Sequence, residues 1–167
     1  MDLINGLLEK CQNKNKDNAM LESFKIESYH ESLNGIIDVL KPIKEYYPNY
    51  ENWIENVVQS GLLDNTRKIR VLKHDGNIAG LSILKDTPDE KKICSLFIHP
   101  EYRGESWMYS IFSDSLTYLK TKKPVITIPS TIIKKYHGLI FSNQWKNTSK
   151  IINRYQSGII EYGFNEK

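Results

Sequence analysis

Cysteine is scarce in this sequence. Only Cys11 and Cys94 occur among 167 residues, and neither stands at a spacing typical of a metal site. Two isolated cysteines make no disulfide framework, so we expect reduced thiols and no bound metal. Cys94 lies inside an apolar run, where a thiol usually behaves as a small hydrophobic side chain rather than as a nucleophile.

Long hydrophobic runs and strong net charge are also missing. No apolar stretch approaches the length of a membrane span, and the first residues lack the apolar core of a signal peptide. We therefore expect a cytoplasmic protein that does not contact a membrane. The net charge of +3 does not suggest a protein that wraps duplex nucleic acid, although it permits an anionic cofactor.

The residues that are present suffice for one domain with a full core. Hydrophobic residues make up 40% of the 167-residue chain and charged residues 26%, which is ordinary for a soluble globular protein. There is no internal repeat and no low-complexity segment. The pattern predicts an N-terminal helix and a polar link over residues 1–20, followed by a single domain over 21–167.

The most informative stretch is 91–112. Its apolar run over 93–98 predicts a buried strand, which His99-Pro100 ends, and a helix follows from about 105 to 120. The first N–H groups of a helix lack internal partners, so a strand, a short turn and a helix can together bind a phosphate. An ordinary strand–helix unit fits the same pattern, because the single glycine of this turn is a weak phosphate signal.

Hydrophobic periodicity predicts the other elements. The expected strands and helices are strands 24–29, 67–74, 77–85, 124–128, 145–154 and 159–164, and helices 33–40, 48–61 and 130–141. Ser32 and Ser130 are expected to cap helix starts, and Gly61 a helix end. Asp75-Gly76 predicts a two-residue hairpin. The crossover from 91–98 to 124–128 is expected to be parallel and right-handed.

This order of elements, from about residue 22 to the end, resembles the GNAT superfamily of acyl-CoA-dependent N-acetyltransferases. The most specific match is ICSLFIHPEYRG, residues 93–104, in which an apolar strand is followed by a proline, an acidic-aromatic pair and Arg-Gly. The resemblance implies an α+β fold, built as a three-layer α/β sandwich. In it, helices flank a mixed, mostly antiparallel central sheet.

The resemblance also implies a co-substrate, acetyl-CoA. In that family the strand equivalent to 93–98 splays from the strand equivalent to 124–128, and the pantetheine arm lies in the gap. Backbone groups of Leu96, Phe97 and Ile98 would then hold the arm, and one N–H would polarise the thioester carbonyl. The pyrophosphate would lie on the turn and the helix start, whose residues are Arg103, Gly104, Glu105, Ser106, Trp107, Met108 and Tyr109.

The turn departs from the family pattern Arg-Gly-x-Gly-x-Gly or Ala. Ser106 and Met108 occupy positions that are usually small. A serine hydroxyl can donate to phosphate, whereas a methionine side chain obstructs close approach unless it points into the core. Glu105 adds negative charge beside the expected anion, which Arg103 partly offsets.

For the proton transfers, the resemblance implies an acid on the helix after strand 124–128 and a base near the start of strand 91–98. Tyr136 is the candidate acid and Glu90 the candidate base, with His99 and His137 as further titratable residues. Each has a simpler interpretation. Tyr136 could be an aromatic residue at the core edge, and Glu90 a solvated turn residue.

Two hypotheses of different classes follow. The first is a cytoplasmic N-acetyltransferase that acts on a primary amine of a small molecule or peptide. The second is a catalytically degenerate GNAT-fold binding or regulatory module. A third, nucleic-acid binding, rests on lysines that a solvated face explains equally well: Lys134, Lys135, Lys146 and Lys150. The N-terminal helix and the final hairpin are candidate contacts of a homodimer.

Overall fold

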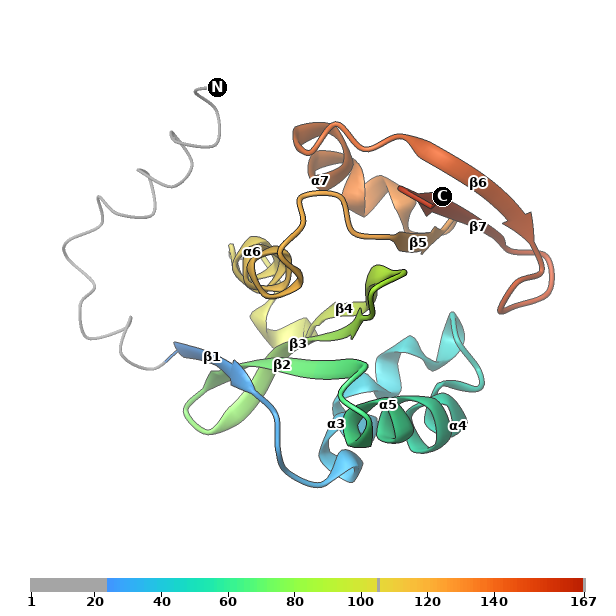
Figure 1. Ribbon diagram of the computed structural model, residues 1–167. Helices are drawn as coiled ribbons and strands as arrows, with labels where there is room; N and C mark the ends of the chain where they lie inside the picture. Colours follow the sequence, from blue (N-terminus) through green and yellow to red (C-terminus); the bar gives the residue numbers. More distant parts are fainter. Residues whose placement is uncertain (1–23, 105, 167) are drawn as a thin grey trace.

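The computed structural model describes residues 24–104 and 106–166, which contain two β-sheets (Figure 1). The first sheet has the antiparallel order β1-β2-β3-β4, and the second has the order β5-β7-β6. The strands are β1 (Phe24–Ser28), β2 (Arg67–His74), β3 (Asn77–Asp86), β4 (Lys91–Ile98), β5 (Ile126–Pro129), β6 (Asn147–Ile152) and β7 (Ile160–Phe164). The predictions for residues 1–20, for Cys11 and for Glu105 lie outside the described residues.

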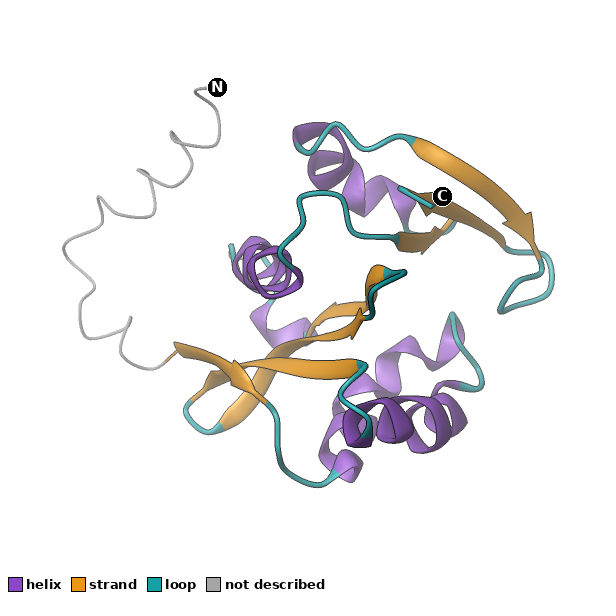
Figure 2. Ribbon diagram, in the orientation of Figure 1, coloured by secondary structure: helices purple, strands orange, loops and turns teal. Residues whose placement is uncertain are grey.

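Helices cover both faces of the first sheet (Figure 2). On one face lie α3 (Leu33–Leu40), the 3-10 helix η1 (Lys41–Glu45), α4 (Tyr50–Trp53), the π-helix η2 (Ile54–Val58) and α5 (Gln59–Leu63). The opposite face is covered by α6 (Trp107–Leu119), which follows the 3-10 turn η3 (Pro100–Tyr102). The 3-10 turn η4 (Ile133–Tyr136) and α7 (His137–Ser142) pack on the second sheet. This is the predicted α+β arrangement of helices around a mostly antiparallel sheet.

Hydrophobic side chains form two main cores, one on each face of the first sheet. The first core joins α3 and η2 to strands β2 and β3, with Ile36, Leu40, Ile54, Ile69 and Ile83 fully buried. The second core joins α6, α7 and the second sheet, and it includes Phe112, Leu119, Ile128, Trp145 and Phe164. Burial of this apolar area supplies most of the driving force for folding.

The two sheets meet at a single parallel bridge between Lys92 of β4 and Val125. The N–H of Ile93 donates to the Val125 carbonyl at 3.0 Å, and the N–H of Val125 donates to the Lys91 carbonyl at 2.7 Å. No further bridge joins β4 to β5 in the described part of the chain. The parallel direction is therefore confirmed, and the strands diverge from this point onward.

Local signals in the sequence predicted several boundaries well. The Ser32 side chain accepts a hydrogen bond from the N–H of Asn34 at 3.3 Å and so caps α3. Asp75 and Gly76 have φ angles of 48° and 79°, which is the left-handed geometry of a tight hairpin turn between β2 and β3.

Two predicted helix ends are wrong. Gly61 does not end its helix, which continues to Leu63. A Cβ atom on Gly61 would lie 2.5 Å from the Arg67 side chain, so tertiary packing requires the glycine there. Ser130 does not cap the next helix, because the turn η4 begins after Ile132 without a side-chain cap.

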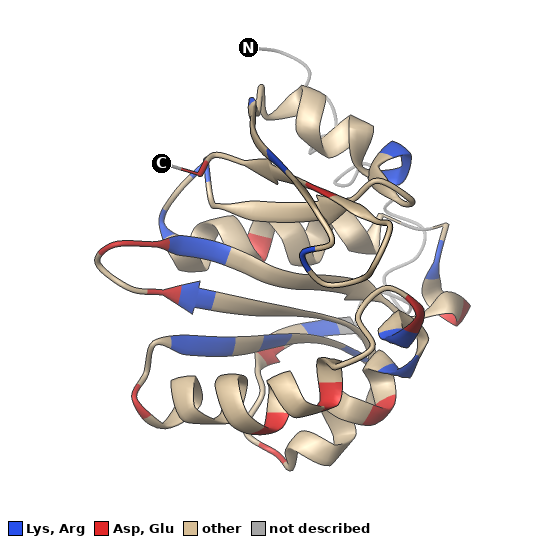
Figure 3. Cartoon of the chain, turned by 90° about the vertical axis from the view of Figure 1, so that its right-hand side faces the viewer, with Lys and Arg blue, Asp and Glu red and all other residues tan. Residues whose placement is uncertain are grey.

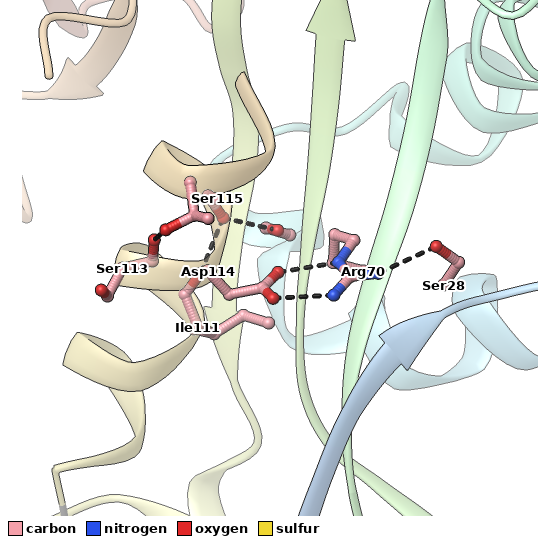
Figure 4. A network of polar contacts seen from close by, with 8 residues as sticks. Ser28, Arg70, Ile111, Ser113, Asp114 and Ser115 are labelled. Atoms are coloured by element: carbon pink, nitrogen blue, oxygen red, sulfur yellow. Dashed lines mark hydrogen bonds and ion pairs between the residues drawn. The ribbon is translucent and has the colours of Figure 1, made fainter. Parts of the chain in front are cut away.

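An ion pair fixes α6 to the first sheet (Figure 4). The Arg70 guanidinium on β2 donates from Nε and Nη2 to the two carboxylate oxygens of Asp114, both at 2.7 Å. Its Nη1 donates to the Ser28 hydroxyl at 2.9 Å. Beside this pair, the buried Ser115 hydroxyl donates to the Ser82 hydroxyl at 2.8 Å. These contacts hold the second half of α6 against β2 and β3.

We expect Asp114→Asn to lower the free energy of unfolding by about 2 kcal/mol, because it removes a bidentate charge-assisted hydrogen bond and leaves a largely buried Arg70 without its counter-ion. Urea denaturation measures the loss. Asp38→Asn is the control, since its pair with Lys41 is exposed and should be worth less than about 1 kcal/mol. Equal losses in the two variants would contradict the prediction.

Candidate functional site

The divergence of β4 and β5 leaves backbone groups of β4 without a neighbouring strand. The N–H of His99 donates to the Ala79 carbonyl at 2.8 Å, so this residue points its backbone towards β3. Backbone direction alternates along a strand, so Phe97 also points towards β3, whereas Leu96 and Ile98 point into the gap. Of the three residues expected to hold an extended ligand, two therefore present their N–H and carbonyl groups to it.

A cleft of about 440 Å³ occupies this gap. Its walls are β4, the start of α6, strand β5, the turn η4 and the segment after α3. The residues that line it include Tyr47, Cys94, Leu96, Ile98, Arg103, Gly104, Met108, Pro129 and Tyr136. Most of the sequence-predicted cofactor residues thus line one cleft, together with the predicted acid Tyr136.

The turn before α6 forms one end of the cleft. Gly104 has a φ angle of +92°, and a Cβ atom there would meet nothing within 4 Å, so its backbone is open to a ligand. The Nε of Arg103 donates to the Ile98 carbonyl at 3.3 Å, which places a positive charge at this end. Ser106 immediately precedes α6 and makes no capping hydrogen bond with its side chain. The turn therefore offers an exposed backbone, a cation and a helix N-terminus.

Two other residues of the predicted phosphate turn lie differently. Trp107 packs against a small cluster around Leu72, Ile98 and Ile111. Tyr109 is half exposed, and its hydroxyl lies near Gly138 of α7. Their backbone N–H groups belong to the first turn of the helix, whereas their side chains are not among those that line the cleft.

Met108 packs against both the second core and the cluster around Ile111, while it also lines the cleft. We expect Met108→Ala to lower the free energy of unfolding by about 2 kcal/mol, through lost contacts, without tightening the binding of acetyl-CoA. Denaturation and calorimetry measure the two effects. Phe141→Ala is the control, because Phe141 is 86% exposed and its truncation should cost little. Tighter binding by Met108→Ala would show that this side chain obstructs the turn.

Tyr136 faces the divergent part of β4. Its hydroxyl donates to the Leu96 carbonyl at 3.5 Å, a long and therefore weak hydrogen bond. Burial raises the pKa of Tyr136, against the opposing effect of the Arg103 charge. The phenol is accordingly protonated at neutral pH and can donate a proton within the cleft.

Glu90, the predicted base, lies in the turn between β3 and β4 and is not among the residues that line the cleft. Its carboxylate accepts a hydrogen bond from Lys85 at 2.6 Å. Burial alone would raise the pKa of Glu90, but the Lys85 hydrogen bond and nearby positive charges outweigh burial and hold the pKa below its usual value. A carboxylate that is already paired and acidified is a poor proton acceptor.

Cys94 lies at an irregularity of β4, where the pairing register with β3 shifts, and it lines the cleft. Its sulfur accepts a hydrogen bond from the Arg67 guanidinium at 3.0 Å. Burial raises the pKa of the Cys94 thiol despite the positive charge of Arg67 beside it. The thiol is therefore protonated at neutral pH and poorly suited to act as a nucleophile.

One titratable residue that the sequence analysis missed is Glu161 of β7. Its side chain is buried, with 2% of the residue exposed, and Oε2 has no hydrogen-bond partner among the described residues. Burial raises its pKa from 4.5 to about 7, although the charges of Arg154 and Lys92 act in the opposite direction. The only signal in the sequence was a glutamate between the apolar residues of the last strand.

Surface charges have a mixed pattern (Figure 3). Acidic residues gather on the helices of the first layer, while basic residues lie along the strands beside them. Several of these cations are paired, such as Lys85 with Glu90 and Lys91 with Asp86. This mixture is typical of a solvated surface rather than of a nucleic-acid-binding patch.

No group of three His, Cys, Asp or Glu side chains that the structure describes is placed to hold a metal ion. Among the helices of residues 24–104 and 106–166, none is long and apolar enough to cross a bilayer.

Comparison with known proteins identifies the fold. No protein-family model matches the sequence, and no curated protein matches it either. Solved structures do match. A protein from Desulfovibrio desulfuricans assigned to the GNAT acetyltransferases has a TM-score of 0.66 and 10% identity, over 84% of this chain and 96% of that one. The chain therefore has the GNAT fold.

Two further similar structures are of proteins with a named ligand or substrate. The PaiA N-acetyltransferase of Thermoplasma acidophilum, in complex with coenzyme A, has a TM-score of 0.63 and 14% identity, over 87% of this chain and 99% of that one. The dodecameric spermidine N-acetyltransferase of Vibrio cholerae has a TM-score of 0.60 and 13% identity, over 86% of this chain and 92% of that one. At such identities the likeness concerns the fold.

Proposed function

We propose, from the GNAT fold and the cleft beside β4, that this chain is an N-acetyltransferase that moves an acetyl group from acetyl-CoA to a primary amine. The observation that carries the proposal is the single bridge between Lys92 and Val125, after which the strands part and Leu96 and Ile98 direct backbone groups into a cleft. An extended ligand with amide groups can pair with such an open strand edge.

The residues of the cleft fit acetyl-CoA. Leu96 and Ile98 can pair with the amides of the pantetheine arm, because the side-chain hydrogen bonds to their carbonyls are long and easily displaced. The open backbone of Gly104, the Arg103 charge and the start of α6 suit the pyrophosphate. Acetyl-CoA supplies an activated thioester, and a β4 N–H directed into the gap can stabilise the negative charge on its carbonyl oxygen.

The remaining chemistry requires proton transfers. The amine must be neutral to attack, and the departing thiolate must be protonated. Tyr136 can supply that proton, because its hydroxyl is protonated and lies against the Leu96 backbone within the cleft. Direct attack by the amine, without an acyl-enzyme on Cys94, agrees with the raised pKa of that thiol.

Calorimetry with acetyl-CoA, followed by a thiol-release assay on spermidine, a simple alkylamine and a peptide with a free N-terminus, tests the proposal. We expect binding and the release of one thiol per amine acetylated. No binding at millimolar acetyl-CoA would overturn it. Binding without turnover of any amine would instead favour the second hypothesis, a degenerate binding or regulatory module. The proposal also includes a small-molecule or peptide amine as the acceptor, a cytoplasmic location and a homodimer. Each of these needs its own assay.

A further inference from the structure

Glu161 occupies the central strand of the second sheet, where a carboxyl group is costly. The residue is 2% exposed, and within residues 24–104 and 106–166 no group forms a hydrogen bond with Oε2. A buried carboxylate without a partner destabilises the folded protein, because it has lost its hydration without gaining a donor. A hydrogen-bond donor brought by a ligand would remove that cost.

The register of the sheet places Glu161 on the side of the cleft. Glu161 of β7 lies directly opposite Pro129 of β5. Residues directly opposite each other in an antiparallel pair have their side chains on the same face. Pro129 lines the cleft, whereas Glu161 is not itself among the lining residues and lies one strand further along the sheet. The neighbouring pair, Ile128 and Tyr162, packs in the second core, although Ile128 also lines the cleft.

Aromatic residues from two segments gather around this face. Tyr47, between η1 and α4, lines the cleft, and its ring meets the edge of Tyr155 at a centroid distance of 5.4 Å. Tyr155 belongs to the loop between β6 and β7. Burial and then the negative charge of Glu161 raise the pKa of Tyr47, with smaller effects of Tyr155 and Tyr136. The carboxyl of Glu161 is therefore near enough to act on Tyr47, which lines the cleft.

The positive charges nearest Glu161 do not pair with its free oxygen. They are Arg154, in the loop between β6 and β7, and Lys92, at the start of β4. The Arg154 guanidinium lies 3.3 Å from the Glu166 carboxylate and 5.4 Å from the centre of the Tyr155 ring. The buried Oε2 of Glu161 thus has no donor among the described residues.

We propose that Glu161 is the general base that receives the acceptor's primary ammonium group and takes its proton, directly or through one water molecule. This inference rests on the acetyltransferase activity proposed above. A proton leaves the ammonium nitrogen for Oε2, and the freed lone pair attacks the thioester carbon. The C–N bond forms and the C–S bond breaks. Tyr136 protonates the departing thiolate, and the second proton lost by the nitrogen, as it becomes the amide, restores the Tyr136 hydroxyl. The proton on Glu161 then returns to solvent.

Glu161 suits this task better than Glu90 does. A general base works best when its pKa lies near the operating pH, so that it is substantially ionised yet basic enough to take a proton. The pKa of Glu161, raised by burial to about 7, meets this condition. Glu90 is held by Lys85, and its pKa is below the usual value. The aromatic rings of Tyr47 and Tyr155 would also favour a cationic acceptor.

Glu161→Gln tests the proposal, with the best acceptor of the amine panel as the probe. We expect kcat/KM for that amine to fall by about 10²-fold or more at pH 7.5. In the wild type, kcat/KM should fall towards acid pH with an apparent pKa near 7, and this fall should be absent from the variant. The dissociation constant for acetyl-CoA should not change. Glu55→Gln is the control, because Glu55 is exposed on η2 and lies outside the cleft.

The outcomes separate the two proposals. If the wild-type protein neither binds acetyl-CoA nor acetylates an amine, both the proposed acetyltransferase activity and the proposed role of Glu161 are wrong. If the wild type is active and Glu161→Gln keeps both its kcat/KM and the acid limb of its pH–rate profile, only the role of Glu161 as the base is wrong. If the variant does not fold, the wild-type profile decides, because an active enzyme without an acid limb between pH 6 and 8 contradicts a base of this pKa. Partial activity of Glu161→Asp with a shifted limb would support the proposal.

Discussion

Tyr136→Phe is expected to lower kcat by about 10²-fold, with little change in the dissociation constant for acetyl-CoA. The substitution removes one hydroxyl from a mostly buried ring, so the ring keeps its place between η4 and β4. Loss of a positioned acid slows departure of the thiolate, because the thiolate must then leave unprotonated or take its proton from water. Steady-state kinetics and calorimetry measure the two quantities.

Tyr50→Phe is the matched control for this variant. The hydroxyl of Tyr50 also donates to a backbone carbonyl, that of Ile37 at 3.1 Å, but the residue belongs to the first core and does not line the cleft. It should lose some stability and retain kcat. If Tyr136→Phe lowered kcat no more than Tyr50→Phe does, Tyr136 would be the core-edge aromatic of the simpler interpretation.

Glu161→Gln is expected to make the protein more stable at alkaline pH, although we propose that it abolishes most of the activity. The folded protein holds the Glu161 proton more tightly than the unfolded chain does, since the pKa is about 7 in one and 4.5 in the other. Wild-type stability from this group is therefore full below pH 4.5 and is lost as the pH rises through 7. The difference in pKa corresponds to about 3 kcal/mol.

Denaturation of wild type and variant at pH 4 and pH 8 measures this effect. The unfolding free energy of the wild type should fall relative to that of Glu161→Gln between the two pH values, by an amount approaching about 3 kcal/mol. Glu55→Gln, with the same change of charge at an exposed position, should follow the wild type. If the unfolding free energies of Glu161→Gln and the wild type changed with pH in parallel, Glu161 would not be a buried carboxyl that destabilises the folded protein when ionised.

The parts of the fold that depend on short-range chemistry could be predicted from the sequence. Asp75-Gly76 can take the left-handed backbone that a tight hairpin needs, and Ser32 can satisfy a free N–H at the start of α3. The strand 91–98 was recognisable because its apolar run ends at a proline. The GNAT resemblance then placed Leu96, Ile98 and the turn at Gly104 in one site, and Arg103 and Gly104 of that turn do line the cleft.

Features that depend on packing between distant segments could not be predicted. Gly61 lies against the Arg67 side chain, and the hydrophobic periodicity of the sequence does not reveal this contact. The π-helix η2 interrupts the α-helical phase, and Val57 within it is 41% exposed. Glu161 looks like the polar side of an alternating strand, and only the folded chain brings Tyr47 near it from more than a hundred residues away.

The single bridge between Lys92 and Val125 also has a consequence for hydrogen exchange. Amides paired in the first sheet are protected from solvent by its ladder, whereas those of Leu96 and Ile98 face a gap and have no neighbouring strand. A ligand that pairs with β4 would slow their exchange and, by joining the two sheets, that of residues around Val125 as well. The bound molecule would then act as a structural strand that couples the opening of two otherwise separately packed cores.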